Sequence, residues 1–149
     1  LIKNYFLKEI ESIIKQGIRI NILGDIKKFS SDLKFILKKS ANTTKNNKKI
    51  IVNLAINYGS KLEIFNALKK VKNKLSVKNF EKNLYTNKMP NPDILIRTGG
   101  YQRLSNFLLW QLAYTELFFL KKLWPDFNSK DLSRIIKRYK YIKRNYGNI

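Results

Sequence analysis

The amino-acid sequence predicts an α/β fold with a mainly parallel central sheet and helices on both of its faces. Short runs rich in β-branched residues alternate along the chain with longer segments of helical periodicity, which is the pattern of β-α-β units. One run, residues 50–56, is apolar almost throughout, as in a strand buried at the centre of a parallel sheet. The chain has 149 residues, of which 44% are hydrophobic, and this length fits a single domain spanning residues 1–149.

The first segment has the periodicity of a helix. Ile2, Phe6 and Ile10 recur at the spacing of one helix face, and Gly17 stands where a C-cap belongs. The first residue is Leu1 rather than Met, and no capping residue precedes the helix. We therefore expect the chain to be a fragment, the C-terminal larger part of its domain, that lacks an N-terminal strand region.

A β-α-β unit is predicted next. Residues 18–23 form a short β-rich run that ends at a Gly-Asp pair, and residues 48–59 form a longer one that ends at Tyr-Gly. Between these strands, Ser30 and Ser31 can cap a helix, which ends in the polar stretch of residues 42–49. We expect the two strands to lie parallel.

A second helix, a weaker helical stretch over residues 76–86 and a third strand complete the predicted order. Ser60 is the expected N-cap of the second helix. The apolar stripe of this helix consists of Leu62, Ile64, Phe65, Leu68 and Val71. Pro90 and Pro92 then interrupt the helical pattern before the strand of residues 93–97.

Charge is the most unusual feature of the composition, because 31 Lys and Arg residues against 10 acidic residues give a net charge of +21. Lys, Ile and Asn supply 61 of the 149 residues, and A/T-rich codons encode all three. Compositional drift therefore explains most of the excess, and scattered Lys outnumbers Arg 25 to 6, unlike a dedicated nucleic-acid surface. We expect no specific nucleic-acid partner, and a basic nucleic-acid-binding module is the less favoured alternative.

The absence of Cys and His excludes several classes of chemistry. A disulfide scaffold, thiolate metal sites, Ser-His-Asp catalysis and imidazole acid–base chemistry all need one of these residues. No uncharged apolar run approaches the roughly eighteen residues of a membrane-spanning helix, and residues 1–16 carry charges within their apolar pattern. We expect a cytoplasmic protein without a signal peptide, with the membrane surface as an alternative location.

The residues after the third predicted strand are candidates for a binding site, because open parallel sheets bind ligands beyond the carboxyl ends of their strands. Arg97 and Arg103 flank a Gly-Gly turn, and Ser105 follows at the expected start of a helix. Guanidinium groups match phosphate oxygens, while glycines, a hydroxyl and a helix N-terminus add donors. The residues alone leave a second interpretation open, a surface loop that uses Gly for positive φ and Ser105 as an N-cap.

Four motifs lie close together in residues 91–127, namely PDILIRTGG, QRLSNFLLWQ, AYTELFF and WPDF. Together they resemble the C-terminal signature of the cis-prenyltransferase family, the isoprenyl transferases. GIRINILGD in residues 17–25 and LAINYGSKLEI in residues 54–64 are similar to internal strands of the same family. The resemblance covers nearly the whole chain.

The resemblance implies roles for individual residues. Arg97, Arg103, Leu104 and Ser105 match the family residues that hold the diphosphate of isopentenyl diphosphate, and Glu116 matches the carboxylate that helps to bind Mg²⁺. A hard carboxylate oxygen suits Mg²⁺, and two guanidinium charges offset much of a diphosphate charge at any physiological pH. Judged by its neighbours alone, Glu116 could equally be a solvated surface charge.

The chain departs from the family pattern in two places. Tyr101 stands where close relatives carry Glu, so a carboxylate that could position Arg103 or a metal is absent. The family motif Asp-Gly-Asn-Gly-Arg-Trp, whose Asp coordinates Mg²⁺ and whose glycines cradle the allylic diphosphate, occurs nowhere in the chain. We therefore expect no catalytic residue within residues 1–149, and we expect this fragment alone to be inactive.

For the full-length protein, the resemblance implies an enzyme that condenses isopentenyl diphosphate onto an allylic prenyl diphosphate with cis stereochemistry. The product would be a long polyprenyl diphosphate, a lipid-carrier precursor, with Mg²⁺ assisting departure of the diphosphate. The resemblance further implies a homodimer, with peripheral membrane contact as an open question. The alternative within the same fold is a non-catalytic partner subunit of a cis-prenyltransferase. Product chain length and allylic primer stay open.

Overall fold

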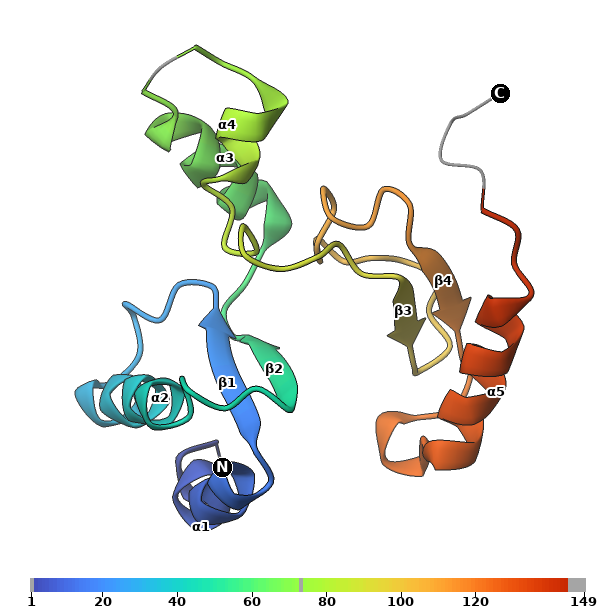
Figure 1. Cartoon of the computed structure of the whole chain (residues 1–149), viewed down its shortest axis with the longest axis horizontal. Helices are drawn as coiled ribbons and strands as arrows, with labels where there is room; N and C mark the ends of the chain where they lie inside the picture. Colours follow the sequence, from blue (N-terminus) through green and yellow to red (C-terminus); the bar gives the residue numbers. More distant parts are fainter. Residues whose placement is uncertain (1, 73, 145–149) are drawn as a thin grey trace. The chain divides into compact units, whose positions relative to one another are not determined.

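The structure is a computed structural model that describes residues 2–72 and 74–144 (Figure 1). The chain divides into two compact units, Leu1–Asn87 and Lys88–Ile149. Each unit contains one pair of parallel strands together with helices. The α/β fold with parallel strands and helices is therefore confirmed. The single domain, and one central sheet covered on both faces, stay predictions.

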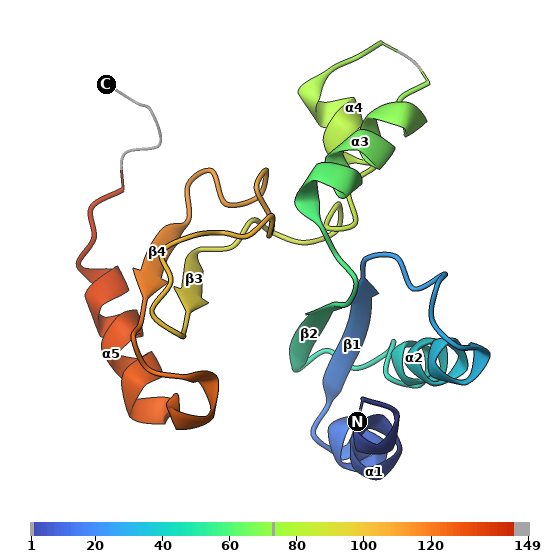
Figure 2. The same ribbon diagram turned by 180° about the vertical axis from the view of Figure 1, so that it is seen from behind.

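The first unit begins with a helix and continues as a β-α-β unit. Its elements are α1 (Ile2–Lys15), β1 (Ile18–Leu23), α2 (Ser31–Thr43), β2 (Ile50–Ala55), α3 (Ser60–Lys70) and α4 (Val77–Glu81). β1 and β2 are parallel, with Ile18 opposite Ile50 and Leu23 opposite Ala55. The predicted β-α-β order is confirmed, and Figure 2 shows the crossover through α2 from behind.

One face of the β1–β2 pair carries the core of the first unit. Ile20 of β1 packs with Ile36 and Leu37 of α2, and Ile13 of α1 contacts the same cluster. Buried Thr44, just after α2, accepts a hydrogen bond from the Ile20 N–H (3.0 Å) and donates one to a carbonyl in the last turn of α2 (2.8 Å). The end of the helix is thereby fastened to the strand.

Local sequence signals set the element boundaries. Ser30 is the N-cap of α2, as predicted, because its hydroxyl accepts a hydrogen bond from the Leu33 N–H. Gly17 has a φ of +71°, the left-handed conformation in which glycine ends helices, and this confirms the predicted C-cap region. At Gly24, a Cβ atom would lie 2.3 Å from the Ile56 carbonyl oxygen, so the turn after β1 excludes any side chain.

β2 is more exposed than its apolar sequence suggests. Ile50 and Ile51 are 53% and 51% exposed, so the prediction of a buried central strand is wrong for the described chain. In the described residues, β1 is the strand that pairs with β2. Leu54 faces the α2 core, whereas Asn53 on the opposite face accepts a hydrogen bond from Asn21 of β1 (2.9 Å).

α3 is the second element whose burial differs from the prediction. Gly59 rather than Ser60 is its N-cap, and no side chain caps the helix there. Leu62, Phe65 and Leu68 of the predicted apolar stripe are 53%, 53% and 45% exposed. The remaining stripe residues, Ile64 and Val71, do pack against the buried cluster of Ala67, Phe80 and Leu84. The stripe prediction is therefore wrong for its three most exposed members.

A buried carboxylate explains which face of α3 turns inward. Glu63 is 1% exposed and accepts hydrogen bonds from the Tyr58 hydroxyl and from the Tyr85 N–H, the latter at 2.7 Å. A carboxylate that is withdrawn from water needs such partners, and both are available on this side of the helix. The polar contacts therefore fix the rotation of α3 against the segment after α4.

The second unit contains a shorter pair of parallel strands. Its elements are β3 (Ile94–Arg97), β4 (Glu116–Phe119), the 3-10 helix η1 (Trp124–Asp126) and α5 (Ser129–Lys140). Ile94 lies opposite Glu116, and Arg97 lies opposite Phe119. The predicted third strand is confirmed. Nothing among the described helices combines the length and the apolar character needed to cross a membrane.

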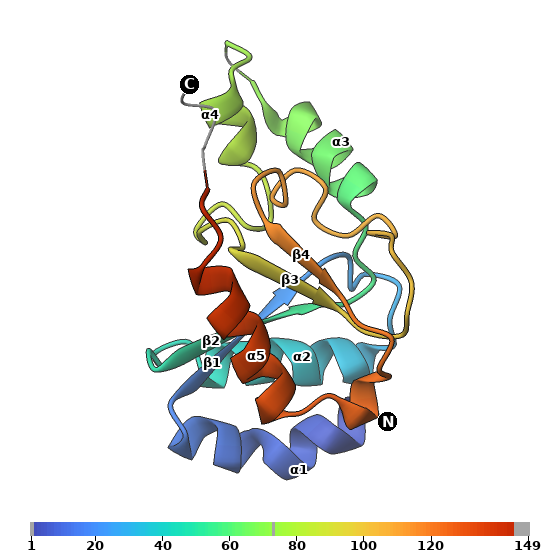
Figure 3. The ribbon, with the colours of Figure 1, turned by 90° about the vertical axis from the view of Figure 1, so that its right-hand side faces the viewer.

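α5 is fastened beside this strand pair at several points (Figure 3). Ile135 of α5 and Phe118 of β4 are buried, and the Arg138 guanidinium lies 5.6 Å from the centre of the Phe118 ring. Near the end of the helix, the Tyr139 hydroxyl donates a hydrogen bond to the carboxylate of Asp93, which precedes β3 (2.9 Å). The helix therefore holds the entry of β3 as well as β4.

Candidate anion-binding site

The loop after β3 is built on backbone hydrogen bonds to the exit of β4. The Leu120 N–H donates to the Arg97 carbonyl, the Gly100 N–H to the Leu120 carbonyl, and the Gly99 N–H to the Lys122 carbonyl, each at 2.8 Å. Gly99 and Gly100 have φ values of +89° and +80°, which glycine adopts without strain. The Gly-Gly pair thus reverses the chain at the carboxyl end of β3.

The Arg97 side chain is hydrogen-bonded to two later residues of this loop. Its Nη1 donates hydrogen bonds to the Ser105 hydroxyl (3.0 Å) and to the Arg103 carbonyl oxygen. A guanidinium has further N–H groups in its plane, and these can donate to an anion. The structure therefore brings together Arg97, Arg103 and Ser105, with half-buried Leu104 between the last two.

The segment after Ser105 is not the helix that the sequence predicts. Residues 105–114 form turns, and Ser105, Asn106 and Leu108 have φ values of +49°, +63° and +45°. Left-handed backbone interrupts a right-handed helix, so no helix N-terminus supplies donors at Ser105. Non-glycine residues in this conformation are strained and are often found at functional sites.

Arg103 projects from the same loop beside an aromatic ring. The carbon of its guanidinium lies 4.1 Å from the centre of the Tyr101 ring, and both residues are exposed. This distance is that of a cation–π contact. The loop therefore presents the two guanidinium groups in different ways, one bonded to the loop backbone and one lying over a ring.

Glu116 lies apart from these residues. It is the first residue of β4, half-buried, and its N–H donates to the Asp93 carbonyl (3.0 Å). Because β3 and β4 are parallel, Glu116 at one end and Arg97 at the other are separated along the strands by roughly 10 Å. The structure places the predicted metal ligand and the predicted diphosphate ligands at opposite ends of the strand pair.

Comparison with known proteins assigns the chain to a family. The family model described as putative undecaprenyl diphosphate synthase matches residues 1–147. The chain belongs to this family. It is 38% identical to an isoprenyl transferase of Oceanobacillus iheyensis and 41% identical to one of Rickettsia felis. Each alignment covers 99% of this chain, and the chain spans 62% and 64% of the length of these two relatives.

Two solved structures of prenyl diphosphate synthases resemble the chain closely. A probable undecaprenyl diphosphate synthase from Campylobacter jejuni matches with a TM-score of 0.90 and 32% identity over 99% of this chain and 71% of its own. Lavandulyl diphosphate synthase from Lavandula x intermedia, solved with dimethylallyl diphosphate, matches with a TM-score of 0.91 and 31% identity over 98% of this chain and 68% of its own. The family resemblance inferred from residues 91–127 is confirmed, and the roles of single site residues stay predictions.

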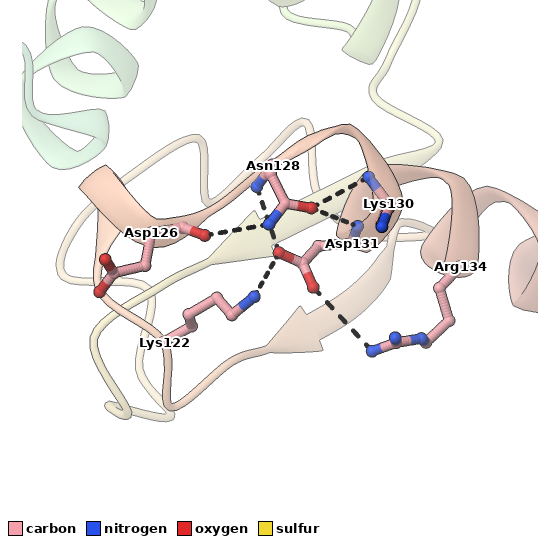
Figure 4. A network of polar contacts seen from close by, with 6 residues as sticks. All are labelled: Lys122, Asp126, Asn128, Lys130, Asp131 and Arg134. Carbon is pink, nitrogen blue, oxygen red and sulfur yellow. Dashed lines mark hydrogen bonds and ion pairs between the residues drawn. The ribbon is translucent and has the colours of Figure 1, made fainter.

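In this prenyltransferase-family chain, a polar network at the start of α5 supports the loop after β3 (Figure 4). The sequence analysis did not predict this network. The Lys122 ammonium lies 2.7 Å from the Asp131 carboxylate, and Arg134 lies 3.9 Å from the other oxygen of that carboxylate. Asn128 and Asp131 form a capping box at the start of α5. Because the Lys122 carbonyl accepts the Gly99 N–H, this network reaches the Gly-Gly turn.

The same network acts on the Asp131 carboxyl group. The hydrogen bond from Lys122, with help from the Asn128 N–H, lowers the pKa of Asp131 below its usual value. An Asn followed three residues later by Asp resembles a capping box in the sequence, and this signal could have revealed the start of α5. Nothing in the sequence could have revealed the partnership with Lys122.

Proposed function

We propose that the chain supplies the isopentenyl-diphosphate site of a cis-prenyltransferase, which condenses isopentenyl diphosphate onto an allylic prenyl diphosphate. The product would be a long polyprenyl diphosphate, a lipid-carrier precursor. The observation that carries this proposal is the loop after β3, where Arg97 bonds to the Ser105 hydroxyl beside Arg103 in a chain matching the prenyltransferase family. The position of the loop, beyond the carboxyl end of a parallel strand, also supports ligand binding.

The role of these residues in the proposed reaction is to bind and orient one substrate. Arg97 and Arg103 would donate charge-assisted hydrogen bonds to the diphosphate oxygens, and the Ser105 hydroxyl would add one more donor. Prenyl transfer forms a carbon–carbon bond, breaks the allylic carbon–oxygen bond and releases diphosphate and a proton. Fixing the diphosphate holds the double bond of isopentenyl diphosphate in place for that step.

The residues present fit Mg²⁺ only as a partner of the departing allylic diphosphate, because Glu116 lies at the opposite end of the strand pair from Arg97. The described residues contain no group of three or more acidic side chains that could hold a metal ion. Mg²⁺ does not need such a group, because it is usually bound by one or two carboxylates, phosphate oxygens and water. Glu116 would be the carboxylate that this chain contributes. When bound, Mg²⁺ would offset the negative charge that develops on the departing diphosphate.

Two other functions are less well supported. A non-catalytic partner subunit would have the same fold, but the retained Arg97, Arg103 and Ser105 favour a chain that binds substrate. A nucleic-acid-binding module is supported by the net charge of +21 alone. An open reading frame upstream of Leu1 that encodes Asp-Gly-Asn-Gly-Arg-Trp would favour the catalytic subunit, and a complete gene without it would favour the partner subunit.

We also propose the partners of the complete protein. Phe107, Leu109 and Trp110 are 37–38% exposed and would contribute to a homodimer interface. The net charge of +21 supports contact with an anionic membrane surface. We also propose a cytoplasmic location, on the basis of the family match.

The direct test is titration of the protein with isopentenyl diphosphate. Arg97→Ala and Arg103→Ala should each weaken binding by roughly ten- to a hundredfold, because each removes a charge-assisted contact of about 1.5–3 kcal/mol. Arg→Lys should restore only part of the loss, since an ammonium keeps the attraction but not the planar fork.

Lys137→Ala is the matched control, because Lys137 is exposed on α5 and carries the same charge. Its affinity should equal that of the wild type within about twofold. If the Arg97 and Arg103 variants bind as tightly as this control, the loop after β3 is not the diphosphate site.

A further inference from the structure

Tyr101 lies between the PDILIRTGG and QRLSNFLLWQ motifs, and its ring contacts Arg103. The Arg103 guanidinium carbon lies 4.1 Å from the centre of the Tyr101 ring, and Tyr101 is 56% exposed. Both residues belong to the loop whose backbone Arg97 holds through the Arg103 carbonyl. The backbone of Arg103 is therefore fixed by Arg97, and its side chain is supported by the ring.

Stacking on a ring restrains a guanidinium without using its hydrogen-bond donors. The ring face attracts the positive charge, while the N–H groups stay in the plane of the guanidinium and point outward. A carboxylate neighbour would instead occupy those donors and cancel the charge. Between Arg97 and Asn106 the sequence contains no acidic residue, and the ion pairs among the described residues do not involve Arg97 or Arg103.

We propose that Tyr101 is a positioning residue, which stacks on Arg103 and holds its N–H groups toward the diphosphate of the substrate. The inference rests on the proposed function, because it presumes that Arg103 binds a diphosphate. Its physical basis is preorganisation: a long side chain that is already held in place loses less freedom when it binds its ligand. Tyr101 itself does not touch the substrate in this arrangement.

Calorimetric titration with inorganic diphosphate tests this role without requiring catalysis. Tyr101→Leu keeps the apolar bulk but removes the ring, and it should weaken binding by about two- to fivefold, as expected for an exposed cation–π contact. Tyr101→Phe keeps the ring and should bind within about twofold of the wild type. Because Tyr101 is exposed, both variants should fold, and circular dichroism with the melting temperature checks this.

A double-mutant cycle separates positioning from a general structural effect. In an Arg103→Ala background, Tyr101→Leu should cause no further loss, since the side chain that the ring supports is gone. In an Arg97→Ala background, the loss should persist. An equal loss in both backgrounds, an unchanged affinity for Tyr101→Leu, or a loss in Tyr101→Phe as large as in Tyr101→Leu would each overturn the inference.

The same titrations distinguish failure of this inference from failure of the proposed function. If Arg97→Ala and Arg103→Ala weaken diphosphate binding and Tyr101→Leu does not, Tyr101 has no positioning role although the site stands. If neither arginine variant affects the binding of inorganic diphosphate, the loop after β3 is not the diphosphate site, and the proposed role of Tyr101 is disproved as well.

Discussion

At the scale of single residues, the loop after β3 shows how one side chain can organise a candidate binding site. Arg97 donates to the Ser105 hydroxyl and to the Arg103 carbonyl, so the groups that would bind an anion are held before the anion arrives. The sequence predicted this grouping because the Gly-Gly pair must reverse the chain. It did not predict left-handed Ser105, because a Ser-Asn pair before an apolar run is also typical of a helix start.

Replacing Glu116 should affect the dependence on Mg²⁺, whereas replacing Arg97 or Arg103 should affect the affinity for isopentenyl diphosphate. Glu116→Ala should raise the Mg²⁺ concentration that the complete enzyme needs and lower its turnover about tenfold or more, because a lost ligand weakens metal binding. The affinity for isopentenyl diphosphate without metal should change little, since Glu116 lies at the opposite end of the strand pair from Arg97.

Steady-state kinetics across a Mg²⁺ titration check this prediction. Glu11→Ala is the control, because Glu11 is an exposed acidic residue of α1. An unchanged Mg²⁺ dependence in Glu116→Ala would mean that Glu116 is a surface charge and no metal ligand.

At the scale of elements, α3 shows why a periodic pattern alone cannot fix which face of a helix is buried. The sequence predicted an apolar stripe, and the structure instead buries Glu63, which two hydrogen bonds hold in place. The partners of this carboxylate come from residues five and 22 positions away. A sequence pattern contains no information about the distant partner, Tyr85.

Glu63→Ala should therefore be strongly destabilising. The Tyr58 hydroxyl and the Tyr85 N–H would lose a buried acceptor, at a cost of about 1–3 kcal/mol each. Leu62→Ala, on the exposed face of the same helix, should cost far less and serves as the control. Chemical denaturation measures both free energies of unfolding, and similar values for the two variants would contradict the role assigned to Glu63.

The start of α5 provides a prediction about pH. The pKa of Asp131 is lowered, mainly by the hydrogen bond from Lys122, so the ionised form is favoured in the folded state. The resulting stability is present above the usual value of 3.8 and is lost as the pH falls through the lower value of the folded state. Asp131→Asn should thus be less stable than the wild type at neutral pH.

Melting temperatures between neutral and strongly acidic pH check this expectation. The difference between Asp131→Asn and the wild type should narrow as the pH falls below 3.8, because protonation removes the same interaction from the wild type. A difference that stays constant across this range would show that the carboxylate charge is not what stabilises the start of α5.

At the scale of the whole molecule, the order of elements was predictable as far as β3, whereas the turns after Ser105 and the exposure of β2 and α3 were not. Local signals such as the Ser30 cap, Gly17 and the Pro90–Pro92 pair mark where helices and strands begin and end. Whether an apolar strand is buried depends on which strands lie beside it, and the described chain gives β2 one hydrogen-bonded neighbour.

Whether the proposed reaction can take place depends on which of the family's motifs the chain contains. Residues 1–149 contain the loop that we propose binds isopentenyl diphosphate but not the Asp-Gly-Asn-Gly-Arg-Trp motif, so purified residues 1–149 should show no prenyl transfer. A radiolabelled isopentenyl diphosphate assay with an allylic primer and Mg²⁺ measures this. Transfer above the level of the Arg97→Ala variant would show that the missing motif is not required.

The exposed strand β2 has a consequence for how the purified chain behaves in solution. Ile50 and Ile51 are half exposed on a strand that the described chain pairs on one side, and such an edge is a template for pairing between molecules. The net charge of +21 opposes that encounter through mutual repulsion. Added salt shortens the range of this repulsion, to about 10 Å at 0.1 M and about 3 Å at 1 M, while leaving the exposed strand edge unchanged. We therefore expect the positive charge of the lysines to keep the chain from aggregating, and we expect it to be least prone to aggregation at low ionic strength.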